Sequence, residues 1–129
     1  MQFVAAARSY VGVPWKHQGR SRTGLDCIGL TVLAGRDCGL SVPLTATYGR
    51  QQAYWQLKPG LVEWCKRIGT PEPGAIVLYK DAIQLHVAVW TEAGTVVQSL
   101  ARARRVVESG INFTPLQVWM YRWERVGEA

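Results

Sequence analysis

The sequence lacks the features that would place it outside the class of small globular domains. Only three of its 129 residues are cysteines and no C-x-x-C spacing is present, so neither a disulfide framework nor a zinc module is indicated. No apolar run approaches the ~18 residues of a membrane-spanning helix. Because 48% of the residues are hydrophobic, the chain can bury a core of its own, and intrinsic disorder is excluded. We expect one domain over residues 1–129.

Acidic residues are scarce beside basic ones, which leaves a net charge of +6. The only tight basic cluster is Arg102, Arg104 and Arg105, and no run of like charge has the five or six residues that mark a nucleic-acid tail. We therefore expect no nucleic-acid partner, and the charge suits an anionic surface. The start MQFVAAARSY has no basic n-region and no secretory apolar stretch, so no Sec signal and no integral membrane contact are expected.

The chain divides into a helical first half and a strand-rich second half, which predicts an α+β fold. Apolar residues at helical spacing predict a helix over residues 2–11. Asp26 is a suitable N-cap for a second, buried helix over residues 27–39. Residues 48–67 are expected to form one or two helical pieces broken at Pro59.

Five runs of residues in the second half are typical of short strands. They lie at residues 75–79, 85–90, 95–98, 105–108 and 117–123. A turn over residues 92–94 predicts a hairpin that brings His86 and Gln98 onto adjacent antiparallel strands. If Trp90 pairs with Thr95, Gln98 lies about opposite Val87, which is one position from His86.

Cys27 is expected at the first turn of the apolar helix that follows a glycine-rich loop. A helix N-terminus favours a thiolate and lowers the pKa of a thiol, and its free N–H groups can receive the oxyanion of an acyl-transfer intermediate. The alternative interpretation is a small buried hydrophobic residue, the common fate of a free cysteine.

His86 lies within an apolar strand, where its imidazole needs a polar partner if it is buried. The Cys27 thiolate is one such partner, and a core or edge histidine with some other partner is the alternative. Gln98 is flanked by valine and serine on the next strand, and its amide oxygen can accept a hydrogen bond from one ring nitrogen while the other nitrogen faces Cys27. A cysteine, a histidine and a polar orienting residue in that order follow papain-type triad logic.

The sequence resembles the NlpC family of papain-like cell-wall cysteine peptidases. The blocks that carry the resemblance are Tyr10–Trp15, Gly19–Ser21, Asp26–Leu30, Pro73–Val77, His86–Val89 and Val97–Gln98. The resemblance runs from about Ala5 to Trp123. The variant loop at residues 16–20 and the closing strand at residues 121–123 are closest to the branch encoded by tailed bacteriophages and gene transfer particles.

The resemblance implies a papain-like fold in which the nucleophile helix packs on an antiparallel sheet of five to six strands. It implies a cysteine endopeptidase that cuts γ-D-glutamyl to diamino-acid bonds in peptidoglycan stem peptides, with no metal and no organic cofactor. Carried over residue by residue, Cys27 is the nucleophile, His86 the general base and then acid, and Gln98 the residue that orients the imidazole.

Two residues depart from the family pattern, because Trp15 stands where a tyrosine is common and Ile28 where serine is usual. Trp15, His17, Gln18 and Asp26 are candidates for substrate binding or oxyanion stabilisation. The alternatives are a solvated loop for His17 and Gln18, and a structural N-cap for Asp26. Cys38 and Cys65 are expected on helix faces as structural thiols.

The leading hypothesis from the sequence is a peptidoglycan hydrolase made in the bacterial cytoplasm, carried by a phage tail and acting at the cell wall. Its expected partners are the stem peptide and phage tail proteins. Two alternatives stay open. The first is a catalytically weak structural or binding module of a phage tail, and the second is a cysteine amidase or acyltransferase on another substrate.

Overall fold

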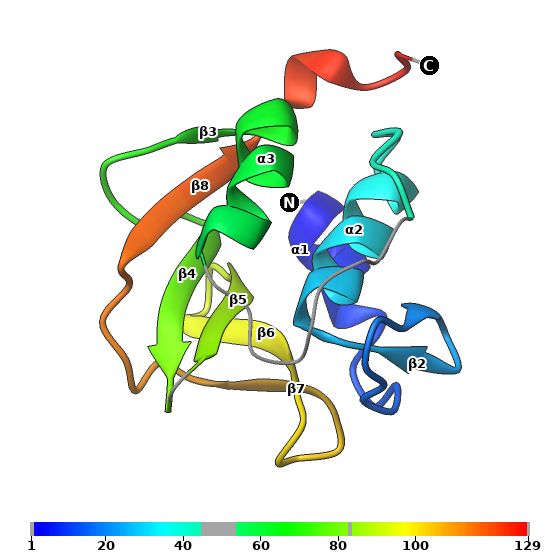
Figure 1. The fold of residues 1–129 in the computed structure, drawn as a ribbon, viewed down its shortest axis with the longest axis vertical. Coiled ribbons are helices and arrows are strands. Elements are labelled where there is room, and N and C mark those ends of the chain that lie inside the picture. Colours follow the sequence, from blue (N-terminus) through cyan, green and yellow to red (C-terminus); the bar gives the residue numbers. More distant parts are fainter. Residues whose placement is uncertain (1, 45–53, 83, 129) are drawn as a thin grey trace.

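The computed structural model describes residues 2–44, 54–82 and 84–128, and within these ranges the chain forms three α-helices beside one large antiparallel sheet (Figure 1). The helices are α1 (Gln2–Arg8), α2 (Cys27–Asp37) and α3 (Tyr54–Trp64). In spatial order the six strands are β3 (Cys65–Arg67), β8 (Gln117–Tyr121), β4 (Ile76–Asp81), β5 (Gln84–Trp90), β6 (Thr95–Leu100) and β7 (Arg105–Gly110). A two-stranded ribbon of β1 (Arg20–Ser21) and β2 (Gly24–Leu25) precedes α2, and a 3₁₀ turn (Trp123–Arg125) follows β8. The α+β class predicted from the sequence is confirmed.

The sheet separates two hydrophobic clusters, because successive side chains of a strand point to opposite faces. The larger cluster lies between the helices and the sheet and includes Phe3 of α1, Leu30 of α2 and Val89 of β5. The smaller cluster covers the other face and includes Tyr79 and Ala88. Both faces are therefore buried in the centre of the sheet, and polar side chains there need partners within the protein.

The helix expected from Cys27 begins where predicted, whereas the break expected at Pro59 is wrong. Pro59 lies inside α3, where its ring removes one backbone hydrogen bond while Leu57 and Trp64 of the same helix are buried against the core. Residues 48–53 of that prediction lie outside the described residues. Cys65 is also placed differently, because it begins strand β3 rather than lying on a helix face.

The hairpin between β5 and β6 forms as predicted, but its register differs by one residue. Trp90 pairs with Val96 instead of Thr95, because residues 91–94 form the loop and the backbone N–H of Thr91 donates to the Thr95 carbonyl at 3.0 Å. A one-residue change moves every side chain to the other face of the sheet. Tyr79 pairs with His86 on β5 and its hydroxyl donates to Gln98, so Gln98 shares a face of the sheet with His86.

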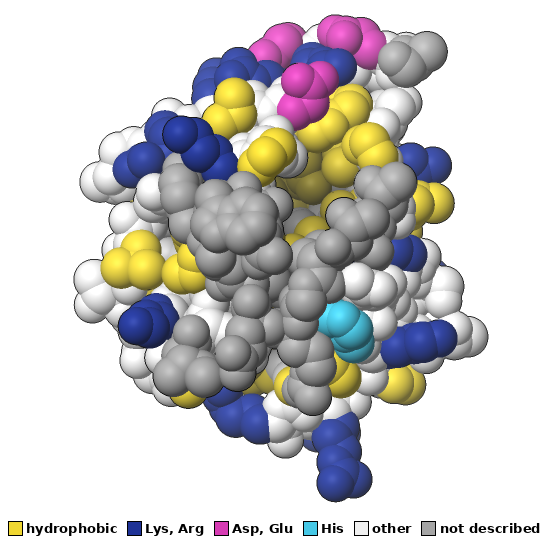
Figure 2. Space-filling model, in the orientation of Figure 1, with side chains coloured by type: hydrophobic (Ala, Val, Ile, Leu, Met, Phe, Trp, Pro, Cys, Tyr) yellow, Lys and Arg dark blue, Asp and Glu magenta, His cyan; other side chains and the backbone are white. Residues whose placement is uncertain are grey.

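Charged side chains are spread over the surface. On the face drawn in Figure 2, lysine and arginine side chains lie at several separate places and acidic side chains gather at one end. The same face is hollowed between α2 and α3 by a mostly hydrophobic pocket of about 380 Å³.

In the part of the chain that the structure describes, no helix has the length and apolar character that crossing a membrane requires.

Candidate active site

Cys27 is the first residue of α2, and Asp26 determines how that helix begins. One carboxylate oxygen of Asp26 accepts hydrogen bonds from the Gly29 backbone N–H at 2.8 Å and from the Arg20 guanidinium at 3.1 Å. The other oxygen accepts from the Gln18 backbone N–H at 2.9 Å. Asp26 is 3% exposed, so its carboxylate is a structural cap that also binds the preceding loop.

Close backbone contacts hold the loop before Cys27 against the helix and the sheet. A Cβ atom added to Gly29 would lie 2.1 Å from the Gly19 carbonyl oxygen, so a side chain at this helical position would force the loop away. The Ser99 hydroxyl of β6 donates to the Leu25 carbonyl at 2.6 Å. These contacts fix the start of α2 relative to β6, and with it the position of the Cys27 thiol.

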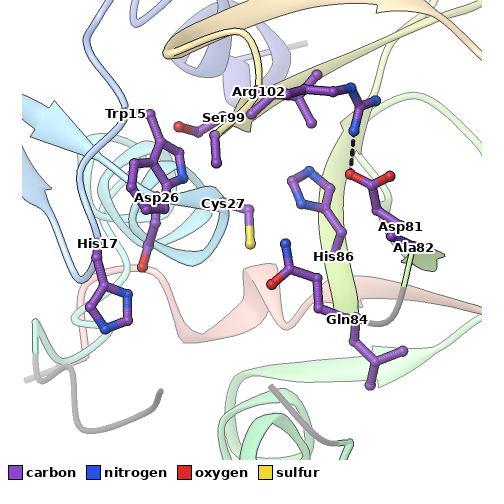
Figure 3. Close-up of a pocket in the computed structure, with 13 residues that line it drawn as sticks. Trp15, His17, Asp26, Cys27, Asp81, Ala82, Gln84, His86, Ser99 and Arg102 are labelled. Atoms are coloured by element: carbon purple, nitrogen blue, oxygen red, sulfur yellow. Dashed lines mark hydrogen bonds and ion pairs between the residues drawn. The ribbon is translucent and has the colours of Figure 1, made fainter. Parts of the chain in front are cut away.

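Cys27 and His86 line the same pocket, which has a volume of about 460 Å³. Figure 3 shows the Cys27 side chain and the imidazole ring of His86 next to each other, with the Gln84 amide below them. Other side chains that line the pocket are Trp15, His17 and Asp26 on one side and Asp81, Gln84 and Arg102 on the other. Of the predicted binding candidates, Gln18 is absent from the pocket lining, and its backbone N–H donates to Asp26.

His86 is held on β5 by its neighbours on β4 and β6. It pairs with Tyr79 in the β4–β5 register, and the two rings meet edge to face with centroids 5.1 Å apart. Tyr79 in turn stacks on Phe113 at 3.7 Å. The histidine is 5% exposed, and its Nε2 atom is buried without a hydrogen-bond partner.

Gln98 lies beside His86, although its amide group is held by two other residues. Its Oε1 atom accepts a hydrogen bond from the Tyr79 hydroxyl at 2.5 Å, and its amide nitrogen donates to the Ser109 hydroxyl at 3.0 Å. Burial lowers the pKa of His86, and the Gln98 amide is close enough to the imidazole to oppose part of that lowering. The orientation of Gln98 is thus determined by Tyr79 and Ser109.

Burial controls the protonation of both central side chains. Removal from water raises the pKa of the Cys27 thiol to about 12, although the N–H groups of Val87 and Ile28 beside the sulfur act in the opposite direction. Burial likewise lowers the pKa of His86 to about 4, against the smaller effects of Asp81 and Gln98. The expected lowering of the Cys27 pKa by the helix N-terminus is therefore wrong, because desolvation outweighs it. At neutral pH both groups are uncharged.

Sequence reasoning missed three residues of this site: Tyr79, Asp81 and Arg102. The signal for the first two was the very short connection between β4 and β5, which makes a tight hairpin and sets Tyr79 opposite His86. Arg102 lies 21 residues from its partner Asp81, and no local pattern indicates that they meet. Among the residues described, no group of His, Cys, Asp or Glu is arranged to hold a metal ion.

Several solved structures share this architecture, and three of them compare with this chain as follows. The NlpC/p60 domain of the peptidoglycan hydrolase SagA is 17% identical with a TM-score of 0.63, over 91% of this chain and 94% of that chain. The P60 domain of antigen MAP1204 from M. avium subspecies paratuberculosis is 19% identical with a TM-score of 0.60, over 92% and 91%. The peptidoglycan hydrolase RipB from Mycobacterium tuberculosis is 20% identical with a TM-score of 0.61, over 91% of this chain and 61% of that one.

No protein-family model and no curated protein matches the sequence. At these identities the likeness is one of fold, and it shows that this chain has the NlpC/p60 fold. The fold that the sequence resemblance implied is therefore confirmed.

Proposed function

We propose that this protein is a cysteine peptidase that hydrolyses peptidoglycan stem peptides at a γ-D-glutamyl to diamino-acid bond. The observation that carries the proposal is the Cys27 thiol at the start of α2, which lines one pocket together with His86 (Figure 3). The structural neighbours SagA and RipB are peptidoglycan hydrolases by name, which supports the same substrate class for this chain.

In the proposed first step, the neutral His86 takes the thiol proton of Cys27 as the sulfur attacks the scissile carbonyl carbon. General-base activation suits this site because both groups start uncharged. Collapse of the tetrahedral intermediate breaks the C–N bond, and the protonated His86 gives its proton to the leaving amine. A thioester on Cys27 remains, and Gln98 keeps the imidazole oriented during the transfer.

In the second step, His86 takes a proton from water while the water oxygen attacks the thioester carbonyl. Breaking the C–S bond releases the carboxylic acid product and returns the proton to the thiol. Backbone N–H groups at the start of α2 can stabilise the oxyanion in both steps, because the first N–H groups of a helix have no acceptor within the helix. Trp15 and His17, on the far side of Cys27 from Arg102, are placed to contact the acyl half of the peptide.

The test is digestion of purified peptidoglycan, with the released peptides identified by mass spectrometry. We expect wild-type protein to release stem-peptide fragments and Cys27→Ala to release none. Cys38→Ala is the matched control, since that thiol lies at the C-terminal end of the same helix and outside the pocket. Equal products from wild type and Cys27→Ala would refute the peptidase, and products cut at a different bond would point to an amidase.

We propose further that the enzyme acts from a phage tail or gene transfer particle. Support comes from the loop at residues 16–20 and the segment at residues 121–123, which resemble that branch of the family. The structure ends β8 at Tyr121, so the strand expected over residues 121–123 stops two residues earlier. An antibody against the protein should detect it in purified particles and label the tail. Particles that lack the protein while the host cell fraction contains it would contradict this role.

A structural tail module with little catalysis is the second candidate, and the neutral, buried Cys27 thiol favours it. Both candidates predict slow labelling of Cys27 by iodoacetamide at pH 6, so thiol labelling does not distinguish them. The digestion does, because the module predicts no product from wild-type protein under any condition in which it stays folded.

A further inference from the structure

The edge of the pocket beside His86 carries an ion pair between Arg102 and Asp81 (Figure 3). Asp81 ends strand β4, and Arg102 lies in the turn between β6 and β7. In the part of the chain that the structure describes, Arg102 is the single arginine or lysine that lines this pocket. The pocket therefore has one permanent positive charge, and that charge lies next to the proposed general acid.

The Arg102 guanidinium has donors to spare for a ligand. Its side chain is 59% exposed, and its hydrogen bond to Asp81 uses only the Nη1 atom. Guanidinium groups present several N–H donors in a plane and bind carboxylates in a forked geometry. An ion pair as exposed as this one contributes little to stability, so diverting Arg102 toward a second acceptor costs the fold little.

The place of Arg102 decides which part of a substrate it meets. His86 gives its proton to the leaving amine in the proposed mechanism, so the amine half of the peptide must lie on the His86 side of Cys27. Arg102 lies on that side, whereas Trp15 and His17 lie on the other (Figure 3). Without Arg102 the nearest charge on the amine side would be the carboxylate of Asp81, which repels an acidic ligand.

We propose that Arg102 is a substrate-binding residue that recognises a carboxylate on the amino acid whose amine is released. The inference rests on the proposed peptidase function and extends it, because it makes the free carboxylate of the leaving residue a determinant of specificity. Asp81 positions the guanidinium and occupies it while the pocket is empty.

The test measures binding by calorimetry to the inactive Cys27→Ala protein, so that no turnover interferes. The probes are L-Ala-γ-D-Glu-diamino acid tripeptides, made with L-Lys or meso-diaminopimelate. In each probe the α-carboxyl group of the diamino acid is either free or amidated. We expect the free carboxylate to bind about tenfold more tightly than the amide with at least one diamino acid. Adding Arg102→Gln should remove that difference, and Arg102→Lys should restore part of it.

Lys66→Gln is the matched control, since it removes an exposed positive charge from β3 at the opposite end of the sheet. It should leave the difference between the two peptides unchanged. Equal affinity for free and amidated peptides, a difference that persists in Arg102→Gln, or no binding of either peptide would overturn the proposal. If wild-type protein cuts no peptide while the Arg102-dependent difference is present, the peptidase proposal fails and the carboxylate site stands.

Discussion

The helical half and the strand half of the molecule hold their parts of the site in different ways. Cys27 is positioned by backbone geometry, through the Asp26 cap and the contact of Gly29 with the preceding loop. His86 is positioned by side chains, through the ring of Tyr79 and the neighbouring Gln98 amide. The position of the proposed nucleophile thus depends on local folding of the chain, and that of the proposed base depends on strand register. Changes in the two halves should differ in whether they affect stability or catalysis.

Removing the proposed base should have the largest effect, and at neutral pH it should fall on catalysis. We expect His86→Gln to lower kcat by about 10³-fold, because general acid–base catalysis is lost in both steps. Peptide release measures this loss of kcat. The affinity of the pocket for the tripeptides should stay within about twofold of wild type. Activity of His86→Gln close to wild type would show that another group accepts the thiol proton.

Removing the helix cap should instead lower the stability of the fold. Asp26→Ala removes the carboxylate from the Arg20 guanidinium, whose side chain is 10% exposed, and we expect a loss of about 3 kcal/mol in unfolding free energy by urea denaturation. Asp37→Ala, at the other end of the same helix, removes a single hydrogen bond to Tyr10 and should cost about 1 kcal/mol. Equal losses would mean that the Asp26 contacts do not hold the loop.

Acid should destabilise the fold through His86. Its pKa is about 4 when folded and about 6.5 when unfolded, so the unfolded state binds the proton first as the pH falls. The stability that His86 contributes is therefore complete above about pH 6.5 and falls by up to roughly 3 kcal/mol by pH 4. Urea denaturation across this range should give a steeper decline for wild type than for His86→Gln. Parallel curves would contradict a buried neutral imidazole.

The smallest expected effect comes from the residue that orients Gln98. Tyr79→Phe keeps the stacked and edge contacts but loses the hydroxyl that donates to Gln98, so kcat should fall about tenfold with KM unchanged. Tyr10→Phe also loses one tyrosine hydrogen bond, to Asp37 outside the pocket, and should keep full activity. If the two variants lose activity equally, Tyr79 has only a structural role.

Much of the architecture could be predicted from local sequence patterns. The N-cap of Asp26, the apolar helix after it and the β-rich runs of the second half each follow from residues close together in the chain. Local patterns failed at two places: they predicted a break at Pro59 that does not occur, and they did not predict strand β3. A proline is tolerated when the helix around it is buried on one side, and a three-residue strand has too few residues to show alternation.

The sequence by itself determined the fold class, the start of α2 and the pair of Cys27 and His86, because caps, turns and apolar periodicity act over a few residues. Only the tertiary structure decided the shared face of His86 and Gln98, the partners of the Gln98 amide and the meeting of Arg102 with Asp81. It also decided that the thiol is neutral, since the pKa of Cys27 is set by its burial. Register and desolvation depend on segments far apart in the chain, and no short pattern encodes them.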